Sequence, residues 1–246
     1  MKSALRHRLE LAAARVCRRL LLRTTLQEVL HREQFFYDAA HYLAFNGIDG
    51  DYVEFGCHGS RTFAMAYHHL RKHGLPARLW AYDSFQGLPA PGGNKDDHPG
   101  WKAGRMRTEL EEFHRLCAAR GVPRHAYEVV PGFYEETIGQ AAPGGSPERI
   151  ALAYIDCDLH SSTAIVLRFL EPRLRPGMIV AFDDYFCHSL AGASGERMAL
   201  LEFLAGNPRW NFLAYIQFGW HGQSFIVEDR ASLTAVSRDR ATFEAG

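Results

Sequence analysis

The sequence lacks the signatures of several protein classes. Its five cysteines stand at positions 17, 57, 117, 157 and 187, with no C-x-x-C pair and no zinc-site spacing, and an odd number argues against a disulfide framework. No apolar run reaches the roughly 18 residues that a membrane span needs. The 28 Lys and Arg residues balance 28 Asp and Glu residues, so bulk charge does not favour nucleic-acid binding. We therefore expect a cytoplasmic protein with no stable membrane insertion and no nucleic-acid partner.

The chain does have the material for a large core. It has 246 residues, 47% of them hydrophobic, which suits one α/β domain. Short apolar runs alternate with helical segments, and the last two runs are joined by the short connection 219–222, which predicts a hairpin. This pattern predicts a doubly wound, mostly parallel seven-stranded sheet with an antiparallel edge strand. We assign residues 1–47 to an N-terminal helical extension and residues 48–246 to the main domain.

The N-terminal segment is strongly basic. Residues 1–24 carry seven Lys and Arg side chains against the single acid Glu10, and apolar residues recur there at helical spacing. One interpretation is a helix that lies on a membrane surface. The interpretation we favour is a helix that packs on the domain or on a second subunit. The second arrangement would give a homo-oligomer formed through the N-terminal helices.

Acidic residues close two of the predicted strands. The apolar runs 150–155 and 178–182 are typical of buried parallel strands, and residues 162–174 between them fit one crossover helix. The first run ends in Asp156 and Asp158, and the second ends in Asp183 and Asp184. A right-handed crossover brings both ends to one edge of the sheet, where open α/β sheets bind ligands. Gathered carboxylates need a cation or protons, so the sequence predicts a metal site and an enzyme.

The first predicted strand leads into a glycine turn that contains Gly56 and Gly59. The third glycine of a dinucleotide-binding loop is missing, which disfavours a nicotinamide-dependent dehydrogenase. Glu54 would repel a pyrophosphate but suits a ligand with an amino group. Asp83, at the end of the second strand, can accept hydrogen bonds from ribose hydroxyls. Together these residues indicate a nucleoside with an amino-acid tail, such as S-adenosylmethionine.

Five motifs in chain order carry a resemblance to a known family. They are Glu54-Phe-Gly56, Tyr82-Asp-Ser-Phe-Gln-Gly-Leu-Pro89, Pro131-Gly-Phe-Tyr-Glu-Glu-Thr137, Asp156-Cys-Asp158-Leu-His-Ser-Ser-Thr163 and Pro176-Gly-Met-Ile-Val-Ala-Phe-Asp-Asp-Tyr185. Over about residues 48–190 the chain resembles the macrocin O-methyltransferase family of class I S-adenosylmethionine-dependent enzymes. The resemblance implies a Rossmann-like methyltransferase domain, magnesium dependence and methylation of sugar hydroxyls in natural products.

The resemblance also implies roles for the matching residues. It places Glu54 and Gly56 at the methionine end of the cofactor, Asp83 on its ribose, Ser84 beside its adenosine, Asp156, Asp183 and Asp184 on the metal, and Asp158 as the general base. We further expect Gly59, Thr62, Phe133 and Asp156 to contact the cofactor and His160 to be an alternative base. The chain departs from the family pattern at Cys157, where a glycine is usual, and in the turn 57–60, which leaves the acceptor open.

We therefore predict an Mg²⁺- and S-adenosylmethionine-dependent O-methyltransferase that acts on a small-molecule or glycan acceptor, namely a sugar or a glycosylated natural product. One alternative is a catechol-type O-methyltransferase with a planar aromatic acceptor. Another is a cofactor-binding module without catalysis. The long loop 84–104, rich in Gly and Pro, is expected to cover the site, with Trp101 over the acceptor.

Overall fold

The computed structural model describes residues 24–138, 145–187 and 192–233. The basic segment before residue 24, and with it the predicted oligomer contact, lies outside the described residues. The helices are α2 (Thr24–Phe45), α3 (Arg61–Lys72), α4 (Leu110–Ala119), α5 (Tyr134–Thr137), α6 (His160–Leu170) and α7 (Gly195–Gly206). The strands are β1 (Asp51–Phe55), β2 (Leu79–Asp83), β3 (Tyr127–Pro131), β4 (Ile150–Ile155), β5 (Ile179–Phe182), β6 (Trp210–Phe218) and β7 (Gly222–Asp229).

All seven strands form one sheet in the order β3-β2-β1-β4-β5-β7-β6. The pairs from β3 to β5 are parallel, whereas β7 runs antiparallel to both β5 and β6. The predicted hairpin folds so that β7 inserts beside β5, and the antiparallel strand lies one position in from the outermost strand, β6. The predicted doubly wound, mostly parallel seven-stranded α/β sheet is confirmed, with its antiparallel strand next to the edge.

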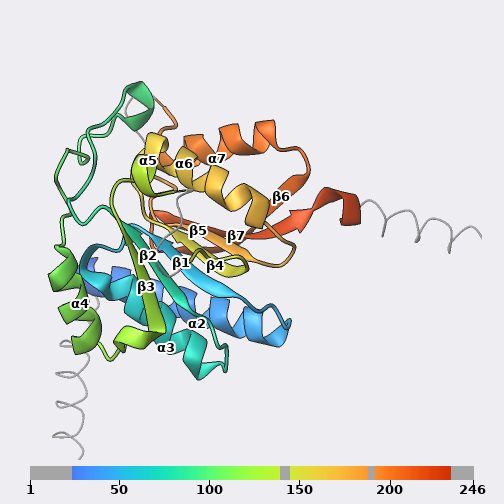
Figure 1. The fold of residues 1–246 in the computed structure, drawn as a ribbon. Coiled ribbons are helices and arrows are strands. Elements are labelled where there is room, and N and C mark those ends of the chain that lie inside the picture. Colours follow the sequence, from blue (N-terminus) through green and yellow to red (C-terminus); the bar gives the residue numbers. More distant parts are fainter. Residues whose placement is uncertain (1–23, 139–144, 188–191, 234–246) are drawn as a thin grey trace, which may run out of the picture.

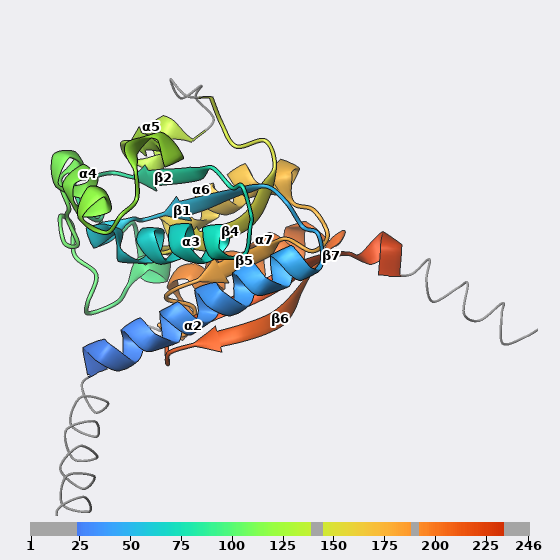
Figure 2. The same cartoon turned by 90° about the horizontal axis from the view of Figure 1, so that it is seen from below.

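Helices cover both faces of the sheet (Figures 1 and 2). One face carries α2, α3 and α4, whose side chains pack with inward residues of the strands in one apolar core. The other face carries α5, α6 and α7 over a second core. Because consecutive strand residues point to opposite faces, Tyr154 belongs to the first core and Ile155 to the second.

Helix α2, within the predicted N-terminal extension, packs on the sheet. Phe35, Phe36 and Leu43 are at most 1% exposed, and the helix lies across the sheet face beside α3 and β6 (Figure 2). Phe35 stacks on Phe218 of β6 with ring centroids 4.5 Å apart. The described part of the predicted extension thus shares a core with the strands.

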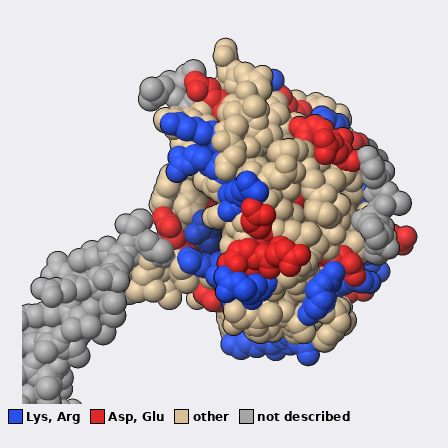
Figure 3. Space-filling view, turned by 60° about the vertical axis from the view of Figure 1, so that its left-hand side comes forward, with Lys and Arg blue, Asp and Glu red and all other residues tan. Residues whose placement is uncertain are grey.

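Charges of both signs are interspersed on the described part of the face shown in Figure 3. This distribution matches the balanced composition and does not resemble the single-sign surfaces that steer ligands over long distances. Among the described residues, no helix has the length and apolar character that crossing a bilayer requires.

Candidate functional site

A cavity of about 630 Å³ opens at the carboxyl ends of β1, β2, β4 and β5. Residues that the sequence singled out form much of its wall. They are Gly56, Gly59, Thr62, Asp83, Ser84, Phe133, Asp156, Asp158, Asp183 and Asp184. The topology therefore brings the predicted cofactor residues and the predicted metal ligands into one space, while Glu54 and His160 do not line it.

The turn after β1 depends on the glycine at position 56. Gly56 has φ +87°, and a Cβ there would lie 1.9 Å from the carbonyl oxygen of Asp156. Only glycine allows β1 and β4 to approach this closely at their ends. Asp83 then ties two turns together, because its Oδ2 accepts the Cys57 N–H and its Oδ1 accepts the Phe85 N–H, both at 2.6 Å. Each oxygen keeps a second acceptor position beside the cavity.

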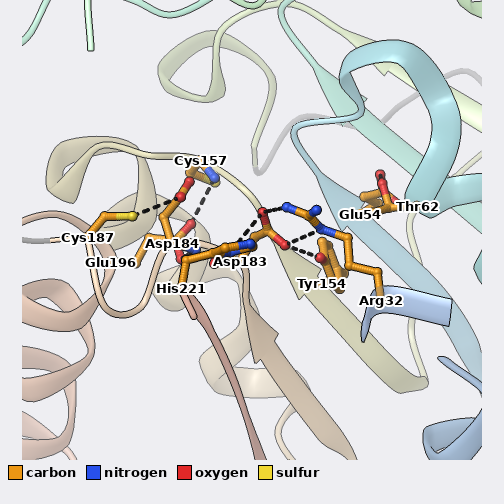
Figure 4. Close-up of polar contacts among 10 residues, drawn as sticks. All are labelled: Arg32, Glu54, Thr62, Tyr154, Cys157, Asp183, Asp184, Cys187, Glu196 and His221. Carbon is orange, nitrogen blue, oxygen red and sulfur yellow. Dashed lines mark hydrogen bonds and ion pairs between the residues drawn. The ribbon is translucent and has the colours of Figure 1, made fainter. Parts of the chain in front are cut away.

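Glu54 lies behind the cavity wall. Its side chain is fully buried and accepts hydrogen bonds from the hydroxyls of Tyr52 and Thr62, the second at 2.7 Å. Burial raises the pKa of Glu54 to about 8, against the opposing effect of those two hydrogen bonds. Figure 4 shows Glu54 and Thr62 apart from Asp183 and Asp184. Thr62 lines the cavity and Glu54 does not, so the hydrogen bond to Thr62 links Glu54 to the cavity wall.

Three carboxylates form the acidic group at the floor of the cavity. Asp156, Asp158 and Asp184 each place an oxygen within 4.8 Å of the others. Burial and then the charges of the neighbouring carboxylates raise the pKa of all three groups. Two like charges about 4 Å apart repel by about 4 kcal/mol at an effective dielectric constant of 20. A divalent cation would remove this repulsion.

Asp183 has a different environment from its neighbours. Arg32 of α2 donates to both of its oxygens, from Nε to Oδ1 at 2.9 Å and from a terminal nitrogen to Oδ2 at 2.6 Å, and the Tyr154 hydroxyl also donates to Oδ1 (Figure 4). Burial alone would raise the pKa of Asp183, but the hydrogen bonds and charge of Arg32 outweigh it and the pKa is lowered. Only Oδ2 has an acceptor position left. The sequence predicts Asp183 as a metal ligand together with Asp156 and Asp184. In the structure Arg32 already donates to both of its oxygens, so Asp183 has less capacity to bind a cation than its neighbours have.

A second group of candidate ligands, Asp183, Asp184 and His221, is less suited to a metal. Its ligand atoms also lie within 4.8 Å of one another. However, the Asp183 carboxylate is already paired with Arg32. The unpaired carboxylates of the first group are the better cation site.

His160 does not enter the cavity. It is the first residue of α6, and its Nε2 lies 2.9 Å from a carboxylate oxygen of Glu202 on α7. Lys95 pairs with the same carboxylate at 2.6 Å. The prediction of His160 as an alternative base is not supported by this placement, because its ring faces a surface ion pair and not the aspartates.

Sequence reasoning missed two residues that shape the site. Arg32 looks like a solvated charge on an amphipathic helix, and nothing local signals that α2 crosses the sheet to Asp183. Glu196 is an acid in the first turn of α7, where such residues usually serve the helix terminus. In the structure it is fully buried and accepts the backbone N–H groups of Cys157 and Asp184.

The residues that line the cavity fit the metal ion and the cofactor that the family motifs imply. Magnesium prefers oxygen ligands and is usually held by one or two carboxylates together with water and substrate oxygens. Asp156 and Asp184 supply such oxygens, and burial together with the charges of neighbouring carboxylates raises the pKa of both groups, so a bound cation would be favourable there. On the other side of the cavity, Asp83 and the glycine turn provide the acceptor and the close backbone approach that a nucleoside needs.

Two curated proteins share part of this sequence. The 8-demethyl-8-(2,3-dimethoxy-alpha-L-rhamnosyl)-tetracenomycin-C 4'-O-methyltransferase of Streptomyces olivaceus is 35% identical over 150 residues, which are 57% of this chain and 54% of that protein. The demethyldecarbamoylnovobiocin O-methyltransferase of Streptomyces niveus is 29% identical over 148 residues, with the same coverage. The chain thus matches about half the length of each relative.

The fold is also found among solved structures. The O-methyltransferase NovP superposes with a TM-score of 0.65 at 23% identity, covering 80% of this chain and 79% of that chain. The sequence model of the macrocin-O-methyltransferase (TylF) family matches residues 30–199, a longer stretch than the motifs alone indicate and one that includes Arg32 and Glu196. Since this match covers well over half of its residues, the chain belongs to the macrocin O-methyltransferase family.

Proposed function

We propose that the protein is an O-methyltransferase that moves a methyl group from S-adenosylmethionine to a sugar hydroxyl of a glycosylated small molecule, with Mg²⁺ in the acidic group. The observation that carries this proposal is that Asp83 and the carboxylates of Asp156, Asp158 and Asp184 line one cavity. Family membership supports the reaction, and the names of the two Streptomyces relatives support a glycosylated acceptor.

The cofactor side is built from β1, β2 and β3. S-adenosylmethionine, when bound, supplies an electrophilic methyl group. Asp83 would accept its ribose hydroxyls, Gly56 would allow its methionine end to approach the turn, and Ser84 and Phe133 would border its adenosine. Holding donor and acceptor in contact supplies much of the rate enhancement of such a transfer.

The acceptor side is built from the ends of β4 and β5. Mg²⁺, when bound, lowers the pKa of a nearby hydroxyl and fixes its position. Asp156 and Asp184 would hold the cation, with Oδ2 of Asp183 as the remaining acceptor on that side. Asp158 lines the cavity beside them and would take the proton of the acceptor hydroxyl. Trp101 lines the same cavity, and its indole opposes the rise in the pKa of Asp158.

Transfer of a labelled methyl group to a panel of glycosylated aromatic polyketides and aminocoumarins tests the proposal. We expect transfer to a sugar hydroxyl, loss of activity with EDTA and recovery with Mg²⁺. Asp158→Asn should lower kcat by about 10²–10⁴-fold, the range for removal of a general base. Transfer only to aromatic diols would indicate a catechol-type enzyme, and cofactor binding without transfer to any acceptor would indicate a binding module.

A further inference from the structure

Glu196 is a fifth carboxylate beside the four aspartates, and its position is unusual. Its side chain is fully buried, and both oxygens are used: Oε1 accepts the N–H of Cys157 at 3.0 Å and Oε2 accepts the N–H of Asp184 at 2.9 Å. One N–H belongs to the turn after β4 and the other to the turn after β5. A single side chain on α7 thus joins the two backbone segments that carry Asp156, Asp158 and Asp184 (Figure 4).

The chemistry of a carboxylate suits this bridge. Both oxygens of an ionised carboxyl group can accept from N–H donors. Burial and the charge of Asp184 raise the pKa of Glu196, and the N–H groups of Cys157 and Asp184 oppose that rise because they stabilise the ionised form. An amide of the same size would direct its own NH₂ group at one of those donors. The first turn of a helix also favours a negative charge, which offsets part of the repulsion from the aspartates.

The residue before Glu196 packs against the same turn. Gly195 has φ +56°, and a Cβ there would lie 2.6 Å from the Trp101 ring and 2.8 Å from the carbonyl oxygen of Asp158. Asp158 itself has φ +60°, a left-handed conformation that is strained for a non-glycine residue. Such a conformation persists only where the surroundings hold it, and Gly195 and Glu196 contact the turn on both sides of Asp158.

We infer that Glu196 is a positioning residue that sets the spacing of the carboxylates at the ends of β4 and β5 and thereby the affinity of this site for a divalent cation. The inference rests on the proposed metal site. Without the bridge, the turns after β4 and β5 would separate under the repulsion of their carboxylates, and two buried N–H groups would lose their acceptors.

Binding of Mn²⁺ to the metal-stripped protein, followed by electron paramagnetic resonance, tests this role without turnover. Glu196→Gln, which keeps one acceptor oxygen, should weaken Mn²⁺ binding by about 10-fold, and Glu196→Ala should weaken it by up to about 100-fold, the range found when the partners of metal ligands are removed. Affinity for S-adenosylhomocysteine should stay within a few-fold. Glu202→Gln makes the same chemical change at a half-exposed position of the same helix and should leave Mn²⁺ affinity unchanged.

Thermal unfolding of each variant separates positioning from general stability, since binding is measured only where the variant is folded. Lower stability with unchanged Mn²⁺ affinity in the folded protein would overturn the inference, and so would equal weakening in the Glu196 and Glu202 variants. If the wild-type protein binds no Mn²⁺, the proposed metal site is wrong and the inference fails with it. Wild-type binding with unaffected Glu196 variants would overturn the inference alone.

Discussion

At the scale of single residues, the acidic side chains of this protein fall into different electrostatic classes. Two hydrogen bonds from Arg32 stabilise the ionised form of Asp183 and lower its pKa. Asp156, Asp158 and Asp184 instead lie close to one another and have raised pKa values. Glu54 is buried among hydroxyl groups. The sequence predicts where these acids meet, because strand ends share an edge, but not which of them are neutralised. The difference comes from Arg32, which lies far away in the chain.

Replacing Arg32 tests the neutralisation of Asp183. Arg32→Met leaves a buried charge without its partner, and we expect the free energy of unfolding of the metal-free protein to fall by about 3–5 kcal/mol. The double variant Arg32→Met with Asp183→Asn should recover part of this loss, because both charges are gone. Urea unfolding of the two single variants and the double variant measures the coupling. Strictly additive losses would show that the ion pair is not the reason for the effect.

The raised pKa of Glu54 gives a pH dependence of known sign. In the folded state this carboxyl group holds its proton to about pH 8, whereas in the unfolded chain it loses the proton near pH 4.5. Between these values the folded state binds more protons, so stability falls as pH rises, by about 1.4 kcal/mol per pH unit from this group alone. Glu54→Gln removes that contribution. The Tm of the variant relative to wild type should therefore increase from about pH 5 to about pH 8, and parallel curves would contradict the buried, protonated Glu54.

At the scale of elements, the strands were more predictable than the segments around them. The strand 150–155 has the bounds that its apolar run indicates, because a buried parallel strand has an unambiguous pattern. Helix α6 instead starts at His160, two residues before the predicted start. Its N-terminus is capped from outside by Asp96 in the long loop, which accepts the N–H of Ser161 at 2.9 Å. A cap supplied by a distant residue leaves no local signal.

The carboxylate of Asp96 also holds the long loop in place. It accepts the backbone N–H and the hydroxyl of Ser161 and the N–H of Gly92, so it fastens the loop to α6. Asp96→Ala should lower stability by about 1–2 kcal/mol, as loss of a helix cap does, and should speed proteolytic cleavage within residues 90–100. Ser161→Ala removes only the hydroxyl bond and should have a smaller effect on both. Equal effects of the two variants in limited proteolysis would argue against the cap.

At the scale of the whole molecule, one sheet edge gathers residues from α2, the glycine turn, the long loop and α7 around the same cavity. The alternation of apolar runs and helical segments predicts the sheet, and ten of the site residues named from the sequence line the cavity. The sequence does not reveal the contributions of Arg32 on α2 and Glu196 on α7. Locally, these two side chains resemble a surface charge and a helix-terminal acid. Binding of a cation at this site should therefore stabilise the whole domain.

Magnesium should therefore change global stability in a pH-dependent way. Asp156, Asp158 and Asp184 have raised pKa values in the metal-free protein, so their contribution to stability falls as pH rises above about 4. A bound cation removes the repulsion between the ionised forms. The increase in Tm on addition of Mg²⁺ should be larger at about pH 8 than at about pH 6. Scanning calorimetry measures the increase, and a change independent of pH would indicate that Mg²⁺ binds elsewhere.

The most direct test of the central claim is calorimetric titration of Mg²⁺ into the metal-stripped protein in the presence of S-adenosylhomocysteine, with wild type and Asp184→Asn compared. We expect one ion per chain for wild type, and for the variant an affinity lower by at least about 10-fold, since a charged ligand of the cation is lost. No binding to wild type, or equal affinity in the two proteins, would contradict that claim.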